Sequence, residues 1–528
     1  MRTELTGTVA LTRFILHRDW IRALIWITAI AVVELLTALS TTRIYSTQAD
    51  LIRSVEAAHG NAAIIAMNGP AQGLDTIGGQ VVFQIGATGL VAVALMAVFM
   101  IGRETRAEEE TGRLDLVRAM PVGRHSATAA ALTVVAGMSA VVGTLVTLGL
   151  VGLGLPAHGS ILFGATLCAE GLVFAGVTIV VAQFTENTRM VFGSAGAVVG
   201  ATFVARAAGD VGDNPLSWFS PIGWAQKTRP YAGDRWWPLL IMTVSVVALV
   251  SLGAALSTRR DIDAGFIRPR PGPRIATPAL GRPLGLALRL QRGSLIGWTV
   301  GLFVAGTAVG WIANDVEDLV GDNQAMRKTI AQLGGVSLTD SYLSTEMLFA
   351  ALIATGFALQ SVLRLRGEET ALRAAPLLAT PLSRRQWILS HLIIALGGSV
   401  IVLAAAGLGS GLTYGIVIGD PSQVPRMLGA ALTYVPALWL FVGLAALLFG
   451  LIPRGVAAAW AALAACFVVG LLGAALSLPT WAEDVSPFRH TPRLPGASLT
   501  AVPLSVLTAI AAALTVGGVF AFRRRDVG

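Results

Sequence analysis

The chain has 528 residues, of which 54% are hydrophobic and only 13% are charged, and its mean hydropathy is +0.71. Soluble domains carry about 25% charged residues, so this composition excludes a soluble globular protein and predicts an all-α membrane protein. The two cysteines, Cys168 and Cys466, lie inside apolar segments. Neither a disulfide framework nor a cysteine-based metal site is therefore expected.

Twelve apolar runs along the chain are long enough to cross a bilayer. A hydrocarbon core about 30 Å thick needs roughly 20 mostly apolar residues per helix. Residues 1–16 lack the features of a cleaved signal peptide, so the first span is expected to remain in the mature protein. The predicted spans are 20–41, 80–102, 126–154, 160–183, 190–208, 238–257, 294–313, 344–364, 387–418, 427–451, 455–476 and 501–522.

The basic residues are distributed unevenly between the two sides of these spans. With the N-terminus inside, 27 of the 38 Lys and Arg residues fall on the inner side. Because Lys and Arg are retained on the cytoplasmic side, the bias predicts a multi-pass protein of a bacterial plasma (inner) membrane with both termini in the cytoplasm. It also explains the net charge of +8 and the pI of about 10.2 without a nucleic-acid partner.

The two halves of the chain share landmarks at a nearly constant spacing. Residues 106–125 align without gaps on 366–385 at an offset of 260. Six crossings return a chain to its starting side, so we predict 12 transmembrane helices in two parallel six-helix repeats, residues 1–262 and 291–528, joined by a Pro/Arg-rich cytoplasmic linker at 263–290. The other matched landmarks are Ser220-Pro221 with Ser486-Pro487, Pro238 with Pro503, and Arg259-Arg260-Asp261 with Arg524-Arg525-Asp526.

Segments outside the spans carry further patterns. Asp50–Ala63 and Val316–Leu333, in long outer loops, are expected to be helical. Residues 9–22 and 284–292 mix apolar and basic side chains, which predicts either amphipathic helices at the cytoplasmic surface or simple basic flanks of the next span. Aromatic side chains expected at the membrane interface are Trp218, Trp224, Trp236, Trp237 and Trp481.

The loops at 103–125 and 366–385 occupy matched positions in the two halves, and both are rich in charged residues. Glu109 and Arg113, and likewise Glu369 and Arg373, have the i,i+4 spacing that predicts an ion pair on a helix face. We expect a short helix in each loop, ended by a proline before the chain re-enters the membrane. The alternative is a solvated, positively charged loop, which the recurrence at matched positions disfavours.

The first of these loops has the pattern Glu-x-x-x-Gly-x-Leu-Asp/Glu-x-x-x-x-x-Pro-x-x-Arg, at Glu108, Gly112, Leu114, Asp115, Pro121 and Arg124. In this it resembles the permeases of type-2 ABC exporters. The fused, double-length chain resembles the members of that family described as drug or polyketide-antibiotic exporters. The resemblance implies that the loop is a coupling helix, which docks on a separate nucleotide-binding ATPase subunit. Two copies of that subunit would bind ATP and Mg²⁺, and this chain would bind no cofactor.

The second loop departs from the pattern, with Leu372 in place of Gly112 and Ala374-Ala375 in place of Leu114-Asp115. The two docking sites are therefore expected to be unequal. The residues that the resemblance assigns to ATPase coupling are Glu108, Glu109, Gly112, Arg113, Leu114, Asp115, Pro121, Arg124, Glu368, Glu369, Arg373, Pro381 and Arg384.

The sequence has no catalytic motif. A P-loop requires a lysine after a glycine-rich turn, but the only lysines, Lys227 and Lys328, do not follow a glycine. The chain is therefore not expected to hydrolyse ATP. The histidines have no metal-ligand spacing and are interpreted as interfacial or packing residues; they are His17, His59, His125, His158, His391 and His490.

Ionisable side chains inside spans are costly and are therefore functional candidates. Glu34 and Glu170 are interpreted either as part of a path that attracts cationic amphiphiles, or as structural carboxyl groups that are protonated or paired with Arg206. Glu34 has no acidic counterpart in the second half, where the matched position is Gly306. The candidate path residues are Glu34, Gln84, Glu170, Arg206, Glu346 and Gln360.

Two functions are consistent with these features. The first is the permease subunit of an ATP-driven exporter of hydrophobic or amphipathic small molecules, surrounded by membrane lipids. The second is a six-plus-six secondary transporter driven by an ion gradient. The loop after the second predicted span lacks the Gly-x-x-x-Asp-Arg/Lys-x-Gly signature of major-facilitator proteins, which favours the first.

Overall fold

The structure is a computed structural model that describes residues 4–45, 47–58, 62–260, 265–267, 274–313, 338–472 and 480–525. All regular elements of these residues are helical. Among them, 12 helices are long and apolar enough to cross a membrane, which confirms the prediction of an all-α protein with 12 transmembrane helices. The chain forms two compact units, Met1–Pro271 and Gly272–Gly528, and each is described separately.

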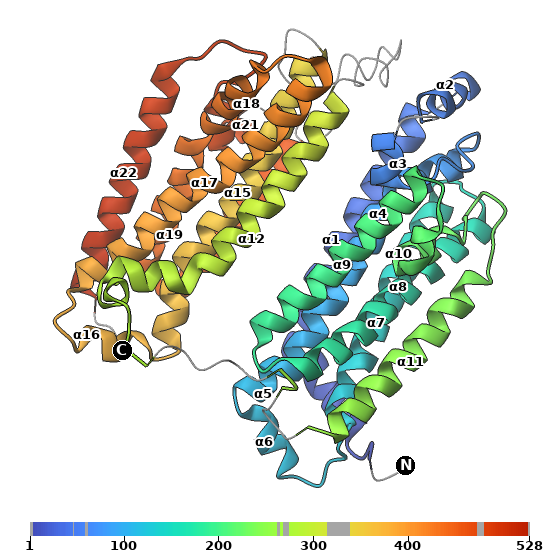
Figure 1. Ribbon diagram of the computed structural model, residues 1–528, viewed down its shortest axis with the longest axis horizontal. Helices are drawn as coiled ribbons and strands as arrows, with labels where there is room; N and C mark the ends of the chain where they lie inside the picture. The colour runs from blue at the N-terminus through green and yellow to red at the C-terminus, as the bar shows by residue number, and fades with distance from the viewer. Residues whose placement is uncertain are drawn as a thin grey trace. The chain divides into compact units, whose positions relative to one another are not determined.

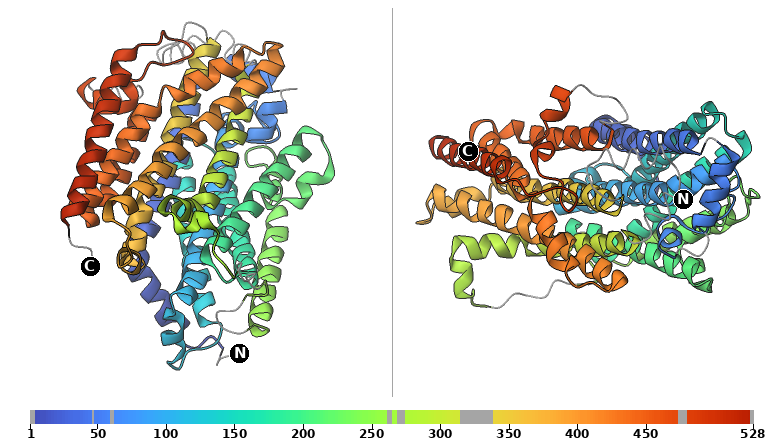
Figure 2. Two further views of the ribbon diagram at one scale, coloured as in Figure 1. Left: turned by 60° about the vertical axis from the view of Figure 1, so that its left-hand side comes forward. Right: turned by 90° about the horizontal axis from the view of Figure 1, so that it is seen from above.

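Unit 1 contains six spans and several shorter helices (Figures 1 and 2). Its elements are α1 (Thr8–Ile44), α2 (Gln48–Ala58), α3 (Ala62–Asn68), α4 (Ile77–Gly102), the π-helix η1 (Arg103–Ala107), α5 (Glu108–Glu110), α6 (Arg113–Arg118), α7 (Ser126–Gly152), α8 (Ala157–Phe184), α9 (Thr188–Val211), η2 (Pro215–Phe219), α10 (Pro221–Gln226) and α11 (Pro238–Thr258).

The helices α4 and α8 form the centre of unit 1. They pack against each other, α7 and α11 pack on α8, and α1 and α9 pack on α4. Glycines allow the close approach of α7 and α8, because a Cβ atom on Gly143 would lie 2.4 Å from the carbonyl oxygen of Gly164. Figure 1 shows α5 and α6 at one end of the unit, which we call its charged end, and α2 and α3 at the opposite end.

Unit 2 also contains six spans, and its short helix α16 lies at the same end of the unit as the C-terminal end of α22 (Figure 1). The helix α12 packs on α17, α22 packs on α19, and α15 contacts both α17 and α19. Its elements are η3 (Pro278–Gly281), α12 (Pro283–Ile312), α15 (Leu338–Thr370), α16 (Ala374–Leu378), α17 (Arg384–Ile418), α18 (Gln423–Leu432), α19 (Val435–Leu451), η5 (Pro453–Ala457), α20 (Ala458–Leu472), α21 (Thr480–Asp484), η6 (Pro487–His490) and α22 (Ala501–Arg524).

Two segments have alternative interpretations from the sequence, and the structure decides between them. Segment 9–22 is the basic flank of the first span and not a separate surface helix, because α1 runs from Thr8 to Ile44 with a kink at Asp19. Residues 284–292 likewise form the start of α12. The single helix predicted at 427–451 is divided into α18 and α19, since Pro436 can neither donate a backbone hydrogen bond nor fit against the preceding turn of a continuous helix.

The predicted helix at Asp50–Ala63 corresponds mainly to α2, which ends at Ala58. The one predicted at Val316–Leu333 lies outside the described residues, as do His59 and Lys328. Of the five interfacial tryptophans, Trp218, Trp236, Trp237 and Trp481 are exposed. The ring nitrogen of Trp224 donates to the carbonyl oxygen of Trp218 at 2.6 Å.

Candidate functional site

The charged element of unit 1, residues 103–124, continues directly from the central helix α4. After Gly102 the helix widens into the π-helical turn η1 and ends with α5. The chain then reverses at Gly112, whose φ of 69° is a left-handed conformation that glycine adopts readily. A Cβ atom at Gly112 would meet nothing within 4 Å, so its backbone conformation, not its small size, requires glycine there.

This reversal makes one prediction wrong. Glu109 and Arg113 do not form the expected i,i+4 pair, because the helix is interrupted between them. Arg113 instead lies 3.5 Å from Glu108. In unit 2, Arg373 likewise lies 3.9 Å from Glu368 and not against Glu369. The interruption there is at Leu372, which adopts a φ of 57° although it is not glycine.

Glu109 connects the charged element to the end of α11. Its carboxylate is buried and accepts hydrogen bonds from Arg106 and, at 2.6 Å, from Arg260. Arg260 also donates to Oε1 of Gln183 in α8 at 2.8 Å. A carboxylate shared by two guanidinium groups in a buried position fixes the elements that carry them.

Two further hydrogen bonds attach the element to the spans. Glu110 accepts from the backbone N–H of Thr188, at the start of α9, at 3.0 Å. Arg124 donates to the carbonyl oxygen of Ser257 near the end of α11 at 2.9 Å. The charged element of unit 1 is thus bonded to several spans and is not a solvated loop.

Unit 2 has the same kind of attachment. Glu369 accepts from Arg525, just after the last helix, as Glu109 accepts from Arg260. Arg384 donates to the carbonyl oxygen of Arg525 at 2.5 Å. Glu109 and Arg260 are matched in the sequence by Glu369 and Arg525, so this pair of landmarks makes the same contact in each unit, whereas Arg124 and Arg384 donate to carbonyl oxygens at different positions.

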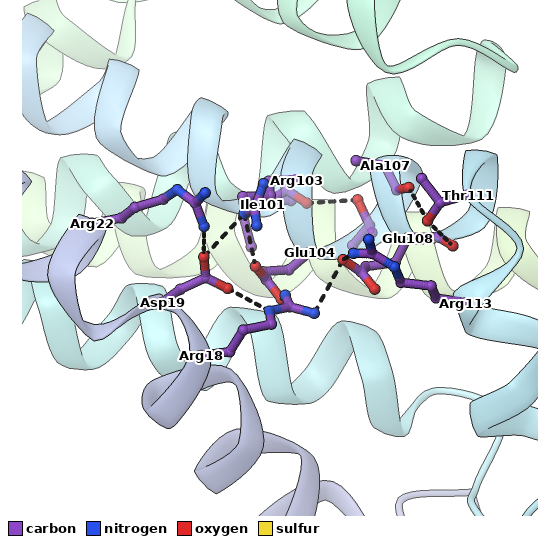
Figure 3. Close-up of polar contacts among 11 residues, drawn as sticks. Arg18, Asp19, Arg22, Ile101, Arg103, Glu104, Ala107, Glu108, Thr111 and Arg113 are labelled. Carbon is purple, nitrogen blue, oxygen red and sulfur yellow. Dashed lines mark hydrogen bonds and ion pairs between the residues drawn. The ribbon is translucent and has the colours of Figure 1, made fainter. Parts of the chain in front are cut away.

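An ion-pair network joins the element to α1 in unit 1 (Figure 3). Asp19 of α1 accepts from Nε of Arg18 at 2.7 Å, from Nε of Arg103 at 3.2 Å, and from Arg22. Arg18 also reaches Glu104 at 2.5 Å and Glu108 at 3.1 Å. The network therefore links the start of α1 with η1 and α5.

Asp19 lies at the kink of α1, where its backbone has φ −112° and ψ 15°, and it is only 2% exposed. The network therefore joins η1 to α1 at the kink of that helix. At the spacing that aligns Trp26 with Trp298, the counterpart of Asp19 is Gln291, which contacts His391 at 3.1 Å and accepts from Ser361. Unit 2 has a neutral polar cluster where unit 1 has an ionic one.

Most of this network was not predicted from the sequence. Arg18 lies in segment 9–22, which was interpreted as either an amphipathic surface helix or a basic flank, and Asp19, Arg103 and Glu104 were given no role. One signal was present, since Asp19 is an acidic residue within a positively charged flank, where a carboxylate needs a local partner. Arg260 was found as a repeat landmark, but its bond to Glu109 depends on where α11 ends in space.

The surface of each element carries exposed apolar residues. Leu116 of α6 is 74% exposed and Met120 is also exposed, while Leu114 is buried. In unit 2, Leu372 is 72% exposed. Most of the other predicted coupling side chains, including Arg113, Asp115 and Arg373, are exposed as well.

The recesses beside the two elements differ in charge. That of unit 1 is mainly acidic and that of unit 2 is basic. The first is lined by Arg106, Glu109, Glu110, Gly112 and Glu186, and the second by Ser383, Arg384, Arg385 and Arg523.

Glu34 and Glu170 are buried in unit 1, with 2% and 0% of their surface exposed. Neither carboxyl group is paired with Arg206, so the expected pairing with Arg206 was wrong. Arg206 lies 3.7 Å from Asp210 and donates to the carbonyl oxygens of Ile65 and Met67 in α3. Among the described residues, neither carboxylate oxygen of Glu170 has a hydrogen-bond partner. Their role in a transport path stays a prediction.

The remaining path candidates are divided between the two units. Gln84 hydrogen-bonds the hydroxyl of Tyr45 in unit 1. In unit 2, Gln360 accepts from Nε1 of Trp298 at 2.8 Å, and Glu346 is partly buried. In the part of the chain that the structure describes, no group of three or more His, Cys, Asp or Glu residues could hold a metal ion.

Comparison with known proteins identifies the family. The chain is 38% identical over 532 aligned positions to the multidrug efflux system permease protein Rv1217c of Mycobacterium tuberculosis (strain ATCC 25618 / H37Rv), and the match covers 99% of this chain and 95% of the relative. The chain belongs to the family of multidrug efflux system permeases. The family described as "Multidrug efflux system permease Rv1217c, C-terminal domain" matches residues 280–523. The permease is thus a multi-pass membrane transport protein, and the matched domain lies within unit 2.

Proposed function

We propose that this permease is the membrane-spanning subunit of an ATP-driven exporter, and that it moves hydrophobic or amphipathic, drug-like small molecules out of a bacterial cell. Two copies of a separate ATPase subunit, which bind ATP and Mg²⁺, supply the energy. The observation that carries the proposal is the charged element of unit 1: its base is bonded to several spans, and it presents the exposed apolar side chains of Leu116 and Met120. A rigid base with exposed apolar side chains suits transmission of force from a docked partner.

Force applied to α6 has three routes into the membrane. The first is through η1 directly into α4. The second is through Glu109 and Arg260 into α11 and α8. The third is through Glu104 and Arg18 into the kink of α1. Because charge-assisted hydrogen bonds are stronger than neutral ones, these routes favour movement of the bonded helices as a set.

We further propose that both units dock an ATPase, and that the two sites are unequal. Six spans separate residue 124 from residue 384, so the two elements lie on the same side of the membrane if all twelve helices cross it. With both termini in the cytoplasm, that side is the inner one. The opposite charge of the two recesses and the replacement of Gly112 by Leu372 support unequal docking.

The proposal is tested by replacing the exposed leucine of α6. Leu116→Glu adds a charge to an apolar contact, and we expect at least a tenfold loss of ATPase co-purification together with loss of ATP-dependent efflux in proteoliposomes. The matched control is Ile275→Glu, because Ile275 is 83% exposed but lies outside the element. Equal ATPase binding by both variants would contradict the proposed docking surface.

One observation favours the alternative of an ion-gradient-driven transporter. Glu34 and Glu170 are buried carboxyl groups in spans, and such groups serve as proton sites in secondary transporters. This alternative predicts efflux by the purified chain without any ATPase, abolished by a protonophore and by Glu170→Gln. Efflux that requires both the ATPase and ATP, and that survives the protonophore, excludes it.

A further inference from the structure

Unit 1 contains a cavity at the end opposite its charged end. It lies between the N-terminal halves of α4 and α8, beside the segment that follows α10, and its empty space including the open mouth is about 510 Å³. Along α4 it extends from Gly79 to Leu90, a rise of about 16 Å. The cavity is thus long and narrow.

The inner part of the cavity is apolar and its mouth is polar. Val82, Gly86 and Leu90 of α4 face Phe163 of α8 along its length. Polar residues of the loops lie at the mouth, and two of them carry the argument: Gln226 and Arg229. This arrangement, an apolar tube with polar groups at one end, is that of a site for an amphiphile.

The polar groups at the mouth retain unused hydrogen-bonding and ion-pairing capacity. Nε2 of Gln226 donates to the carbonyl oxygen of Asn68 at 2.9 Å, but its Oε1 is buried without a hydrogen bond among the described residues. The guanidinium of Arg229 has no ion pair within the described part of the chain. Burial and the neighbouring Arg235 lower its pKa, so an anion would be stabilised there.

The loop that carries Arg229 is held firmly in place. The ring of Tyr231 lies against Gly78 and Gly159, where an added Cβ atom would be 2.6 and 2.4 Å from ring atoms. The hydroxyl of Tyr231 is 2.6 Å from Oγ of Ser160. Arg229 itself has a φ of 48°, a conformation that persists only where the surroundings fix it.

We infer that this cavity binds an amphiphile with one narrow apolar arm and a negatively charged head, with the head at Arg229 and the arm directed toward Leu90. The inner part offers no cationic partner to a negatively charged head, since the ionisable side chains nearest to it are carboxyl groups. Thr166, at the inner part of the cavity, precedes Glu170 by one helical turn, and Gly89, adjacent to Leu90, contacts the carboxyl group of Glu34. The inference requires no ATPase partner, so it can fail independently of the proposed function.

The test uses the purified full-length chain in nanodiscs of zwitterionic lipid. The probes are two photoreactive C12 fatty acids, with the diazirine either near the carboxylate or near the chain end. We expect the first to label residues 226–232 and the second to label the segments around Leu90 and Phe163. Dodecanoate should compete at least tenfold better than dodecylamine, because Arg229 supplies a charge-assisted bond.

Two variants and two controls complete the experiment. Arg229→Gln should weaken competition by dodecanoate about tenfold, whereas Arg189→Gln, which alters an exposed arginine at the start of α9, should not. Gly86→Leu fills the tube and should abolish labelling. Gly152→Leu puts the same side chain at an open position of α7 and should not.

Equal competition by dodecylamine, or labelling unchanged by Arg229→Gln and Gly86→Leu, would overturn the inference. The inference holds whether the bound probe exchanges slowly or quickly. Slow exchange identifies a resident membrane amphiphile, and fast exchange identifies a ligand in transit.

Discussion

Replacing Asp19 by asparagine tests the ionic network of unit 1. The substitution keeps the size of the side chain but removes the charge shared by three guanidinium groups. Two of these bonds, from Arg18 and Arg103, are partly shielded from solvent. The side chain of Arg22 is 52% exposed, so its bond contributes little to stability. Hydrogen bonds to charged groups contribute about 1.5–3 kcal/mol each, and asparagine keeps one acceptor, so we expect a loss of roughly 2–3 kcal/mol.

The measurement is reversible unfolding of the purified chain in mixed micelles, titrated with SDS. The control is Asp115→Asn, which removes the same charge from an exposed position in α6 and should cost less than about 0.5 kcal/mol. In a double-variant cycle with Arg103→Gln, the coupling energy should be at least about 1 kcal/mol. If Asp19→Asn lowers the free energy of unfolding no more than Asp115→Asn does, or if the cycle shows no coupling energy, the network does not connect α1 with α4.

The same variant has a functional consequence under the proposed mechanism. Because the third route into the membrane passes through Asp19, less efflux is expected per ATP hydrolysed, with ATPase co-purification unchanged. A proportional loss of hydrolysis and efflux would instead indicate that Asp19 supports docking itself.

Three further predictions concern backbone conformation, a buried charge and helix packing. Gly112→Leu should destabilise the first element by about 1 kcal/mol through its left-handed φ, and Leu372→Gly should stabilise the second by a similar amount, which amide hydrogen exchange of residues 103–124 and 366–385 would show as changes of opposite sign. Arg206→Met should cost about 3 kcal/mol in micelle unfolding by leaving Asp210 buried without its partner, whereas Arg206→Lys should lose less. Gly143→Val should prevent α7 from packing on α8 and lower the yield of folded protein, while the same change at Gly137, where an added Cβ atom meets nothing within 4 Å, should be tolerated.

The number of spans and the all-α fold class followed from the sequence. A helix in lipid requires a long apolar run, whichever other helices it packs against. The charges of residues 9–22 leave open whether this segment is a separate surface helix or the flank of the first span. The backbone continues through it, since a helix tolerates Arg18 and Asp19 when they neutralise each other and reach partners in η1.

The candidate site was predicted in part. The positions of Glu108, Glu109 and Arg124 were found from the repeated pattern, but their partners were not. Glu109 was assigned to Arg113 by i,i+4 spacing, which holds only within a continuous helix. The left-handed turn at Gly112 ends that continuity, so Glu109 is free to bind Arg260, which is 151 residues further along the chain.

The sequence by itself determined that this protein is helical and multi-pass, because hydropathy acts locally along the chain. Only the tertiary structure decided which carboxylates meet which guanidinium groups, and that α4 and α8 enclose a cavity beneath Arg229. Those contacts depend on where helices end and on how closely glycines let them approach, and neither is a property of any single segment.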